Sequence, residues 1–307
     1  MADKNRAVTD RIEPGSTFKI VAVGAALNEG LVTPRSTLDC GNPSIDYKGR
    51  TIKLPKEDEP FGILSVADIV AHSSNRGAAQ LAMGLGEQRF YEYARKFGFG
   101  QATAFPLGSE VRGTLAPPSQ WDGLTISRLP MGHSVDATPL QIHMAMSIVA
   151  NGGTLLRPQI IKEIRDTRGQ VIRSFAPEKR DQVIGRATAA TLAQLLTGVM
   201  RVGTAKGFDI EGFEVAGKTG TTQKIIDGKY STAHHVASFV GFFPASRPQV
   251  VLSVIVDDAK VAGGTAYGRV VAAPAFHHIA EQLIQYLDIK PVQPTARNFL
   301  AMAGGAP

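Results

Sequence analysis

The stretch "EPGSTFKIVAVGAALNEG", residues 13–30, places a serine and a lysine at the entrance of a strongly apolar segment. The pattern predicts a helix over residues 17–28, because Pro14 and Gly15 disfavour its extension upstream and a glycine follows its end. A helix that is apolar on nearly every side belongs in the interior of a protein. Ser16 is therefore expected at or near the N-terminus of a buried helix.

Ser16 and Lys19 form a Ser-x-x-Lys pair. Three helical residues turn the chain by about 300°, so the two side chains share one face of the helix. A serine hydroxyl is a weak nucleophile until a base removes its proton, and a lysine desolvated beside an apolar helix can act as that base. The backbone N–H of Ser16 could also stabilise an oxyanion. A capping serine followed by a solvated lysine has the same spacing, so the pair alone does not establish a site.

The motif "HSSN", residues 72–75, lies in a break between two predicted helices. Ser73 and Asn75 flank one residue, and both side chains can project into the same cleft. A second hydroxyl there could pass a proton to a leaving group, and a carboxamide could hold a substrate amide. Serine and asparagine are also common helix caps, which is the alternative interpretation of this motif.

The motif "AGKTGTT", residues 216–222, falls on a predicted strand. Alternation along the strand places Lys218 and Gly220 on one face and Thr219 and Thr221 on the other. Gly220 would let a ligand backbone approach closely, as an added antiparallel strand would. Lys218 supplies positive charge, and the threonine hydroxyls can hold a carboxylate. An ordinary strand with a bulge glycine has the same pattern.

The three motifs occur once each, in the order that is shared by penicillin-binding proteins and class A β-lactamases. The chain resembles the transpeptidase domain of a class B, monofunctional penicillin-binding protein, and "NRAVTDRIEPGSTFK" is most similar to the division-specific (septal) type. The resemblance runs from about residue 5 to residue 289. It includes segments without catalytic residues, such as "SEVRGTLAPPSQW", "TPLQIHMAMSIVANGG", "HHVASFVGFFP" and "YGRVVAAPAF".

The resemblance implies a peptidoglycan D,D-transpeptidase that works through a serine acyl-enzyme. Ser16 would attack the penultimate D-Ala carbonyl of a stem peptide (D-Ala-D-Ala), with Lys19 as its base and Ser73 and Lys218 completing the proton path. An amine from a second stem peptide would then take the acyl group. β-Lactam antibiotics would trap Ser16.

The resemblance also implies how substrate is held. Asn75 would hold the donor peptide, and Thr219 and Thr221, around Gly220, would bind the terminal carboxylate. The backbone N–H groups of Ser16 and Thr221 would form the oxyanion hole. Neither a cofactor nor a metal is implied.

Helical patterns early in the chain and three strand patterns late in it, at residues 213–224, 234–245 and 249–258, predict an α+β fold. The expected architecture is the penicillin-binding protein/serine β-lactamase-like one, an antiparallel sheet with helices on both sides. Residues 1–289 are expected to form the transpeptidase domain. Residues 290–307, rich in Pro, Ala and Gly, are expected to be a disordered tail.

Relatives usually have a membrane anchor, a non-catalytic pedestal and two sheet strands before the serine motif, whereas fifteen residues precede Ser16. We therefore expect an N-terminally truncated chain whose sheet lacks those strands and exposes an edge. The resemblance places the full-length protein in the bacterial cell envelope, at the outer (periplasmic) face of the cytoplasmic membrane. Cell-division and glycosyltransferase proteins would be its partners, through regions absent here. The chain without the anchor is expected to be soluble.

The composition argues against several other classes of protein, namely membrane-spanning, nucleic-acid-binding and metal-binding proteins. Hydrophobic residues make up 43% and charged residues 20%, as in soluble globular proteins, and no uncharged stretch approaches the ~18 residues of a membrane span. The net charge of +6 comes from scattered cations, so no nucleic-acid partner is expected. Cys40 is the only cysteine, and the adjacent histidine pairs at 234–235 and 277–278 do not have metal-ligand spacing.

Serine β-lactamases and D,D-carboxypeptidases share the acylation apparatus and remain alternatives. The class A β-lactamase base, a glutamate with an asparagine four residues later, has no counterpart at the glutamates considered, which are Glu87, Glu92, Glu110, Glu163 and Glu178.

Two further alternatives come from other classes. A Ser/His/Asp hydrolase is disfavoured because Asp136 replaces the second glycine of a Gly-x-Ser-x-Gly elbow at residues 132–136. Asp136 is instead expected to cap the helix that begins near Pro139, for which Thr138, with Pro139 and Gln141 after it, also has the pattern of a capping box. A non-catalytic scaffold or sensor with the same fold is the other alternative.

Overall fold

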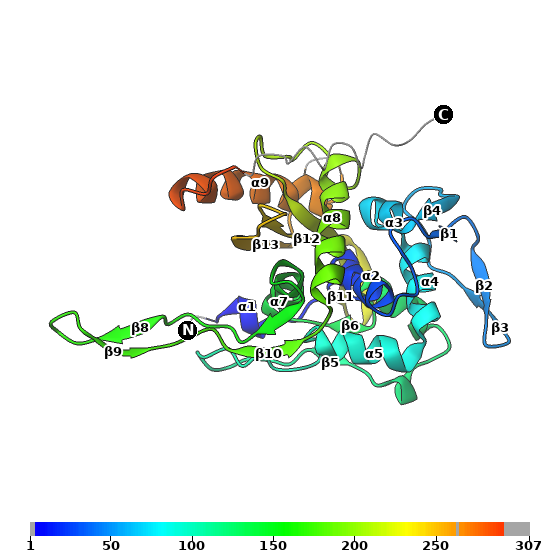
Figure 1. The fold of residues 1–307 in the computed structure, drawn as a ribbon. Coiled ribbons are helices and arrows are strands. Elements are labelled where there is room, and N and C mark those ends of the chain that lie inside the picture. Colours follow the sequence, from blue (N-terminus) through cyan, green and yellow to red (C-terminus); the bar gives the residue numbers. More distant parts are fainter. Residues whose placement is uncertain (1–3, 262–263, 292–307) are drawn as a thin grey trace.

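The central sheet is built from the last strands of the chain: β11 (Ala216–Ile226), β12 (Lys229–Phe243) and β13 (Val250–Asp257). They are antiparallel in that order, with Gly220 opposite Ser238 and Ser238 opposite Ile255. The computed structural model describes residues 4–261 and 264–291, and within them the sheet has these three strands (Figure 1). All three correspond to the predicted strand segments.

Helices and smaller hairpins surround the sheet (Figure 1). The α-helices are α1 (Arg6–Thr9), α2 (Lys19–Asn28), α3 (Val66–His72), α4 (Asn75–Leu85), α5 (Glu87–Lys96), α6 (Thr125–Arg128), α7 (Pro139–Ala150), α8 (Arg186–Arg201) and α9 (Gly268–Tyr286). Short 3-10 turns are η1 (Gly15–Phe18), η2 (Pro118–Gln120) and η3 (Leu129–Met131). The remaining strands are β1 (Thr37–Asp39), β2 (Ser44–Tyr47), β3 (Arg50–Lys53), β4 (Ile63–Ser65), β5 (Thr114–Leu115), β6 (Val135–Asp136), β7 (Thr154–Leu156), β8 (Glu163–Arg165), β9 (Val171–Ser174) and β10 (Lys179–Gln182).

Helices pack on both faces of the sheet. On one face, Phe276 of α9 stacks edge-on against Phe239 of β12, with ring centroids 4.6 Å apart. The next residue of β12, Val240, points to the opposite face and lies across from Ser253. Ser253 Oγ is 2.9 Å from Nδ1 of His143, which belongs to α7. The α+β architecture with helices on both sides is therefore confirmed.

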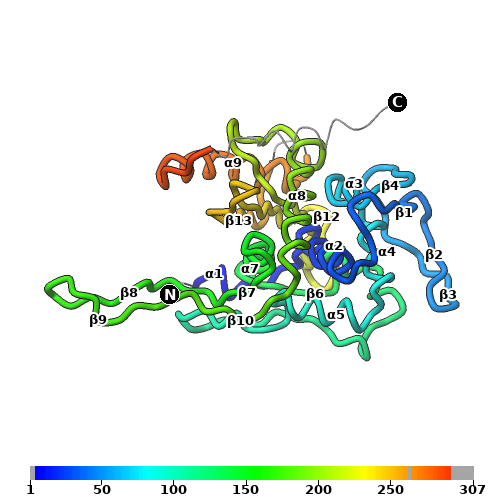
Figure 2. The backbone as a smooth tube through the Cα atoms, viewed as in Figure 1, coloured from blue at the N-terminus to red at the C-terminus, as the bar shows by residue number. Residues whose placement is uncertain are grey.

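Helix α2 passes through the interior, surrounded by α4, α5 and α8 (Figure 2). All its residues from Lys19 to Ala26 are buried. Phe18, which immediately precedes α2, packs edge-on against Phe99 with ring centroids 4.6 Å apart. The predicted helix over residues 17–28 is thus present, but its first turn belongs to the 3-10 turn η1, which begins at Gly15 with a positive φ of +56°.

Two helix starts follow the sequence closely. Helix α3 is capped by Ser65, whose hydroxyl accepts from the Asp68 N–H. Helix α7 has a complete capping box between Thr138 and Gln141. The expected cap by Asp136 is wrong, because Thr138 occupies the cap position while Asp136 accepts a hydrogen bond from the Thr114 hydroxyl.

Strands β8 and β9 form an antiparallel hairpin that projects from the body of the molecule (Figure 1). Strands β1, β2 and β3 lie within residues 37–53, for which no strand was predicted. Strand β13 has a partner on one side only within the described part of the chain. The proposed tail lies outside the described residues from 292 onward. Among the described helices, none is long and apolar enough to cross a membrane.

Candidate active site

Ser16 lies on η1, which is held against two neighbouring segments. The Gly15 N–H donates to the Gly132 carbonyl at 3.3 Å, and an added Cβ at Gly132 would lie 2.2 Å from the Gly15 carbonyl oxygen. The Lys19 N–H donates to the Ser16 carbonyl and closes the 3-10 turn. Because residues i and i+3 eclipse in a 3-10 turn, Ser16 and Lys19 share one face of η1.

Lys19 is buried, with 3% of its surface exposed. Its Nζ donates to the Ser73 carbonyl and to Asn75 Oδ1 at 2.6 Å, and it lies 3.1 Å from Ser73 Oγ. Burial lowers the pKa of Lys19 to about 8, while the charges of Glu57 and Asp58 act in the opposite direction. A neutral amine has two N–H groups and one lone pair, so Lys19 can satisfy both carbonyl oxygens and still accept a proton from a hydroxyl.

Ser73 ends helix α3 in the left-handed region, with φ +62° and ψ +39°. A non-glycine residue is uncommon there, and such strain concentrates at functional sites. This conformation places Ser73 Oγ between the two amines, 3.1 Å from Lys19 Nζ and 2.8 Å from Lys218 Nζ. One hydroxyl thus bridges two lysines that are 199 positions apart along the chain, at 19 and 218.

Lys218 is almost completely buried on β11, with 1% of its surface exposed. Its Nζ also donates to the Thr219 carbonyl at 3.3 Å. Burial lowers the pKa of Lys218 well below its ordinary value, and the positive charge of Lys19 lowers it further. The two amines therefore disfavour being charged at the same time.

Glu57 is a buried carboxylate that sequence reasoning missed. It accepts from the Ser74 hydroxyl at 2.6 Å and from the backbone N–H groups of Asn75 and Arg76 at 2.8 Å each. These bonds fix the start of helix α4 and the turn that carries the second motif. In the sequence Glu57 belongs to the acidic run 57–59 within a turn-rich region, where nothing distinguishes it from a solvated charge.

Gly220 lies where η1 crosses β11. An added Cβ there would lie 2.4 Å from Ser238 Oγ, 3.1 Å from Thr17 Cγ2 and 3.2 Å from the Pro14 carbonyl oxygen. The space is therefore filled by the chain's own residues, and the glycine permits the serine turn to pack on the strand.

The threonine hydroxyls of β11 already have partners. Thr219 Oγ1 is 2.7 Å from Thr204 Oγ1, and Thr221 Oγ1 accepts from the Gly268 N–H at 2.9 Å. A hydroxyl that accepts one bond keeps its own O–H as a donor. Thr221 therefore keeps its O–H for an incoming anion. In the pair of Thr219 and Thr204 only one hydroxyl can donate to the other, so one O–H of that pair also stays available.

The backbone N–H of Thr221 points away from β12. The Asp258 N–H donates to the His235 carbonyl, and in an antiparallel ladder hydrogen-bonded pairs alternate with non-bonded ones. Counting along the ladder from that bonded pair, Gly220 and Ser238 of β12 form a hydrogen-bonded pair. The N–H of the next residue, Thr221, therefore points to the side of β11 that has no strand partner within the described residues. A Cβ at Gly15 would lie 3.3 Å from the Thr221 carbonyl oxygen, so the serine turn reaches the same edge.

The structure thus brings together all the predicted site residues, from η1, the α3–α4 junction and β11. Within the described residues no hydrogen bond is formed by the Ser16 hydroxyl. Its side chain is partly exposed, as a nucleophile requires.

In this fold a partly exposed serine lies between a buried helix and the edge of an antiparallel sheet. The chain belongs to the penicillin-binding protein transpeptidase domain family, whose model matches residues 2–281. It is 35% identical to stage V sporulation protein D of Bacillus subtilis and 35% identical to penicillin-binding protein PbpB of Mycolicibacterium smegmatis, over 94% of this chain in both cases. The aligned regions are 44% and 45% of those proteins, so the chain spans less than half the length of these relatives.

Solved structures show the same likeness. Penicillin-binding protein 3 from Mycobacterium tuberculosis, in complex with aztreonam, superposes with a TM-score of 0.83 at 32% identity, covering 94% of this chain and 66% of that one. The transpeptidase domain of penicillin-binding protein 3 from Burkholderia pseudomallei superposes with a TM-score of 0.81 at 28% identity, covering 95% of this chain and 84% of that one.

Proposed function

We propose that this chain is a serine D,D-transpeptidase that cross-links peptidoglycan stem peptides through an acyl-enzyme and is acylated by β-lactams. The observation that carries the proposal is the placement of Ser73 Oγ between two buried lysine amines beside the serine turn. The relatives support it: a 29% identical protein of Neisseria flavescens, aligned over 96% of this chain and 70% of its own length, is named a probable peptidoglycan D,D-transpeptidase.

In the first half-reaction Ser16 Oγ attacks the carbonyl carbon of the penultimate D-Ala, and its proton passes to neutral Lys19. The negative charge that develops on the carbonyl oxygen is stabilised by the backbone N–H groups of Ser16 and Thr221. Lys19 is suited to this role because its pKa of about 8 leaves about a tenth of the amine neutral at pH 7, far more than the ordinary pKa of 10.5 would.

Collapse of the tetrahedral intermediate breaks the peptide C–N bond and releases the terminal D-Ala. The departing nitrogen takes the hydroxyl proton of Ser73, and a proton from Lys19 or Lys218, both within hydrogen-bond distance, replaces it. In the second half-reaction the acceptor amine attacks the ester carbonyl and its proton passes through the Ser73 hydroxyl to Lys19, while Lys19 returns a proton to Ser16 Oγ as the ester C–O bond breaks. The Ser73 hydroxyl thus carries a proton to the leaving group in the first half-reaction and from the acceptor amine in the second.

Substrate contacts follow from the groups that remain available. Asn75 Oδ1 accepts from Lys19 and keeps a second lone pair for a donor-peptide N–H, while its Nδ2 donates to the Lys56 carbonyl at 2.7 Å. The terminal carboxylate is bound by the hydroxyls of Thr219 and Thr221. Gly220 keeps the strand edge close to the serine turn.

We further propose where the protein acts and with which partners. Residues 1–289 would form the transpeptidase domain of a protein that acts at the outer face of the bacterial cytoplasmic membrane, together with division and glycosyltransferase proteins. The name of the Bacillus subtilis relative refers to sporulation, and the role proposed for this chain is the division-specific (septal) one.

The test is covalent labelling with a fluorescent penicillin. The chain should be labelled, Ser16→Ala should lose the label completely, and Ser44→Ala, a change at an exposed serine on β2, should keep it. A folded but unlabelled chain would contradict the proposal and favour a scaffold.

Two assays separate the related enzymes. A single slow burst with nitrocefin is expected, whereas rapid turnover would identify a β-lactamase. Release of D-Ala from a stem-peptide analogue should accompany transfer to an added amine, and release by hydrolysis alone would identify a carboxypeptidase.

A further inference from the structure

A second buried carboxylate, Glu13, lies three residues before the nucleophile, and the reaction described above does not use it. The side chain of Glu13 is 8% exposed. Its Oε2 is 2.9 Å from Nδ1 of His133, and its Oε1 accepts from the Ser134 N–H at 3.1 Å and from the Tyr230 hydroxyl at 3.0 Å. A carboxylate that is removed from water needs such donors, so the burial of Glu13 depends on these three contacts.

The carboxylate also fixes the protons of its partners. An ionised carboxylate only accepts hydrogen bonds, so we assign the imidazole proton of His133 to Nδ1. Burial, and then the charge of Glu13, raise the pKa of Tyr230 to about 12, so its hydroxyl stays protonated and donates at neutral pH. The rings of His133 and Tyr230 stand edge-on, with centroids 5.8 Å apart. The network therefore has one hydrogen-bond arrangement, with Glu13 at its centre.

The network ties the serine turn to two other segments. One is the turn at residues 132–134, whose first residue accepts from the Gly15 N–H at 3.3 Å. The other is the β11–β12 hairpin, in which Tyr230 belongs to β12. On β11 the Thr222 hydroxyl donates to the Glu13 carbonyl at 3.3 Å. Glu13 therefore holds the nucleophile relative to the strand that supplies the second oxyanion donor.

The turn at residues 132–134 has left-handed backbone on both sides of His133. The φ angle is +83° at Gly132 and +62° at Ser134. A non-glycine residue is uncommon in this region, and such conformations persist only where the surroundings hold them. The hydrogen bond from the Ser134 N–H to Glu13 is one such support.

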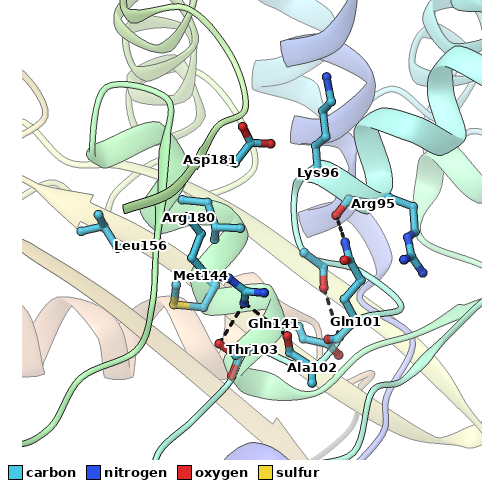
Figure 3. A pocket seen from close by; sticks show the side chains of 12 residues that line it. Arg95, Lys96, Gln101, Ala102, Thr103, Gln141, Met144, Leu156, Arg180 and Asp181 are labelled. Carbon is cyan, nitrogen blue, oxygen red and sulfur yellow. Dashed lines mark hydrogen bonds between the residues drawn. The ribbon is translucent and has the colours of Figure 1, made fainter. Parts of the chain in front are cut away.

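The chain beyond this turn is held independently of the carboxylate. Ile12 and Ala137 exchange two backbone hydrogen bonds, at 3.0 and 2.8 Å. Gln141 of α7 donates through Nε2 to three backbone carbonyls between residues 98 and 112. Figure 3 shows Gln141 beside Gln101, in the lining of a cavity between α5, α7 and the strands β7 and β10. Loss of the carboxylate should therefore leave this frame in place and loosen the serine turn.

We propose that Glu13 is a positioning residue for the acylation step. Its carboxylate holds the serine turn against the β11–β12 hairpin and the turn at residues 132–134, so that Ser16 Oγ and the Thr221 N–H reach the same carbonyl group. This inference rests on the proposed function. A misplacement of about 1 Å can cost about a hundredfold in rate, so loosening the network should slow the chemical step more than it weakens binding.

The test measures acylation at increasing penicillin concentration, which separates the limiting rate from the half-saturating concentration. Glu13→Met keeps the length of the side chain without an acceptor. It should lower the limiting rate about thirtyfold or more and change the half-saturating concentration by less than about threefold. Glu13→Gln keeps an acceptor oxygen and can donate to His133 in its other tautomer, so its limiting rate should stay within about tenfold of the unchanged chain.

Variants of the two side-chain partners provide the same test if Glu13→Met does not fold. His133→Leu should lower the limiting rate about tenfold, whereas His133→Asn, whose amide N–H can replace Nδ1–H, should stay within about threefold of the unchanged chain. Tyr230→Phe removes one hydroxyl at a position that is 48% exposed and should lower the limiting rate about threefold. Tyr286→Phe, at a tyrosine that is 85% exposed, is its control and should have no effect.

Thermal unfolding without penicillin separates these effects from loss of the fold. If Glu13 only stabilised the fold, the folded fraction of each variant would fall while its limiting rate stayed unchanged. Unchanged limiting rates in folded His133→Leu and Tyr230→Phe, or in folded Glu13→Met, would overturn the inference and leave the proposed function intact. Equal losses in His133→Leu and His133→Asn would overturn the role of the Nδ1–H donor. A chain that penicillin does not acylate at all contradicts the proposed function, and the inference with it.

Discussion

The two outer strands of the sheet each leave one side of the backbone without a strand partner within the described residues, but their surroundings differ. At β11 the edge is covered by the serine turn, and Lys218 and Thr219 are buried at 1% and 7% exposure. At β13 the residues from Val250 to Val256 are half-buried, and four of them border an apolar groove of about 560 Å³ between α1 and α7: Val251, Leu252, Ser253 and Ile255. An unpaired strand is a general template for binding, and the side chains around it decide what it can do.

The largest expected effect concerns the buried amines at the β11 edge. Lys19→Met removes the proposed base but keeps an unbranched side chain, so the acylation rate by penicillin should fall by about a thousandfold or more. Because the Ser73 carbonyl and Asn75 Oδ1 lose their donor, the free energy of unfolding should also fall, by about 1–3 kcal/mol, partly offset by the removal of a buried amine. Intact-mass spectrometry over time measures the rate. A variant acylated as fast as the unchanged chain would exclude Lys19 as the base.

A pair of proline substitutions tests the β13 edge. The ladder phase directs the N–H of Val254 to Phe239 of β12 and that of Ile255 to the open groove. Val254→Pro should therefore lower the free energy of unfolding by about 3 kcal/mol. Ile255→Pro should cost less than half of that, as measured by urea denaturation. Equal losses at both positions would show that the outer side of β13 is not open.

The carboxylate of Glu57 connects stability to the site. Glu57→Gln weakens three hydrogen bonds to the start of α4 and should lower the free energy of unfolding by about 2 kcal/mol, with slower acylation. Glu59→Gln is the control, since Glu59 is exposed. The idea that Glu57 positions the site fails if the two variants acylate and unfold alike.

The pH dependence of acylation follows from the lowered pKa of Lys19. The rate should rise about tenfold per pH unit below pH 8, where the neutral amine is scarce, and level off above it. Since the ordinary pKa is 10.5, the unfolded chain binds more protons between about pH 8 and 10.5, and this group makes stability rise with pH across that window. Glu57→Gln should move the midpoint of the acylation profile to lower pH, and an unchanged midpoint would argue against this cause.

The smallest effect is expected at the exposed end of β13. Arg6 contacts Asp257 at 2.7 Å and also pairs with Asp10, but its side chain is 63% exposed. Arg6→Ala should lower the free energy of unfolding by less than about 1 kcal/mol, with a smaller difference at high salt. A loss as large as that of Glu57→Gln would show that α1 is an essential cover of the groove.

Local patterns were sufficient for the elements whose ends carry specific residues. Helix α7 begins at Pro139, as predicted, and β11 and β13 begin and end within three residues of their expected positions, whereas β12 begins five residues earlier, at Lys229. The sequence could not show that the chain would enter α2 through a 3-10 turn, because that depends on Gly15 packing against Gly132. The short strands β1 to β3 were missed, since they are too short and too exposed to have a clear alternation.

The three motifs could be recognised in the sequence, but the residues and conformations that hold them in place could not. Ser16, Ser73 and Lys218 stand out by their spacing to neighbouring residues, which can be seen in one dimension. Glu57 acts through three hydrogen bonds to another segment, and no local pattern marks it. The left-handed conformation of Ser73 likewise depends on the junction between two helices.

The order of residues by itself determined the chemical groups, the apolar helix behind the serine and the late antiparallel strands, because these depend on side-chain type and short-range periodicity. The tertiary structure decided that two distant lysines share one hydroxyl, because burial and charge depend on what packs around each amine. It also decided which strand edge faces the serine turn and which faces an apolar groove, since the two edges differ only in the segments that cross them.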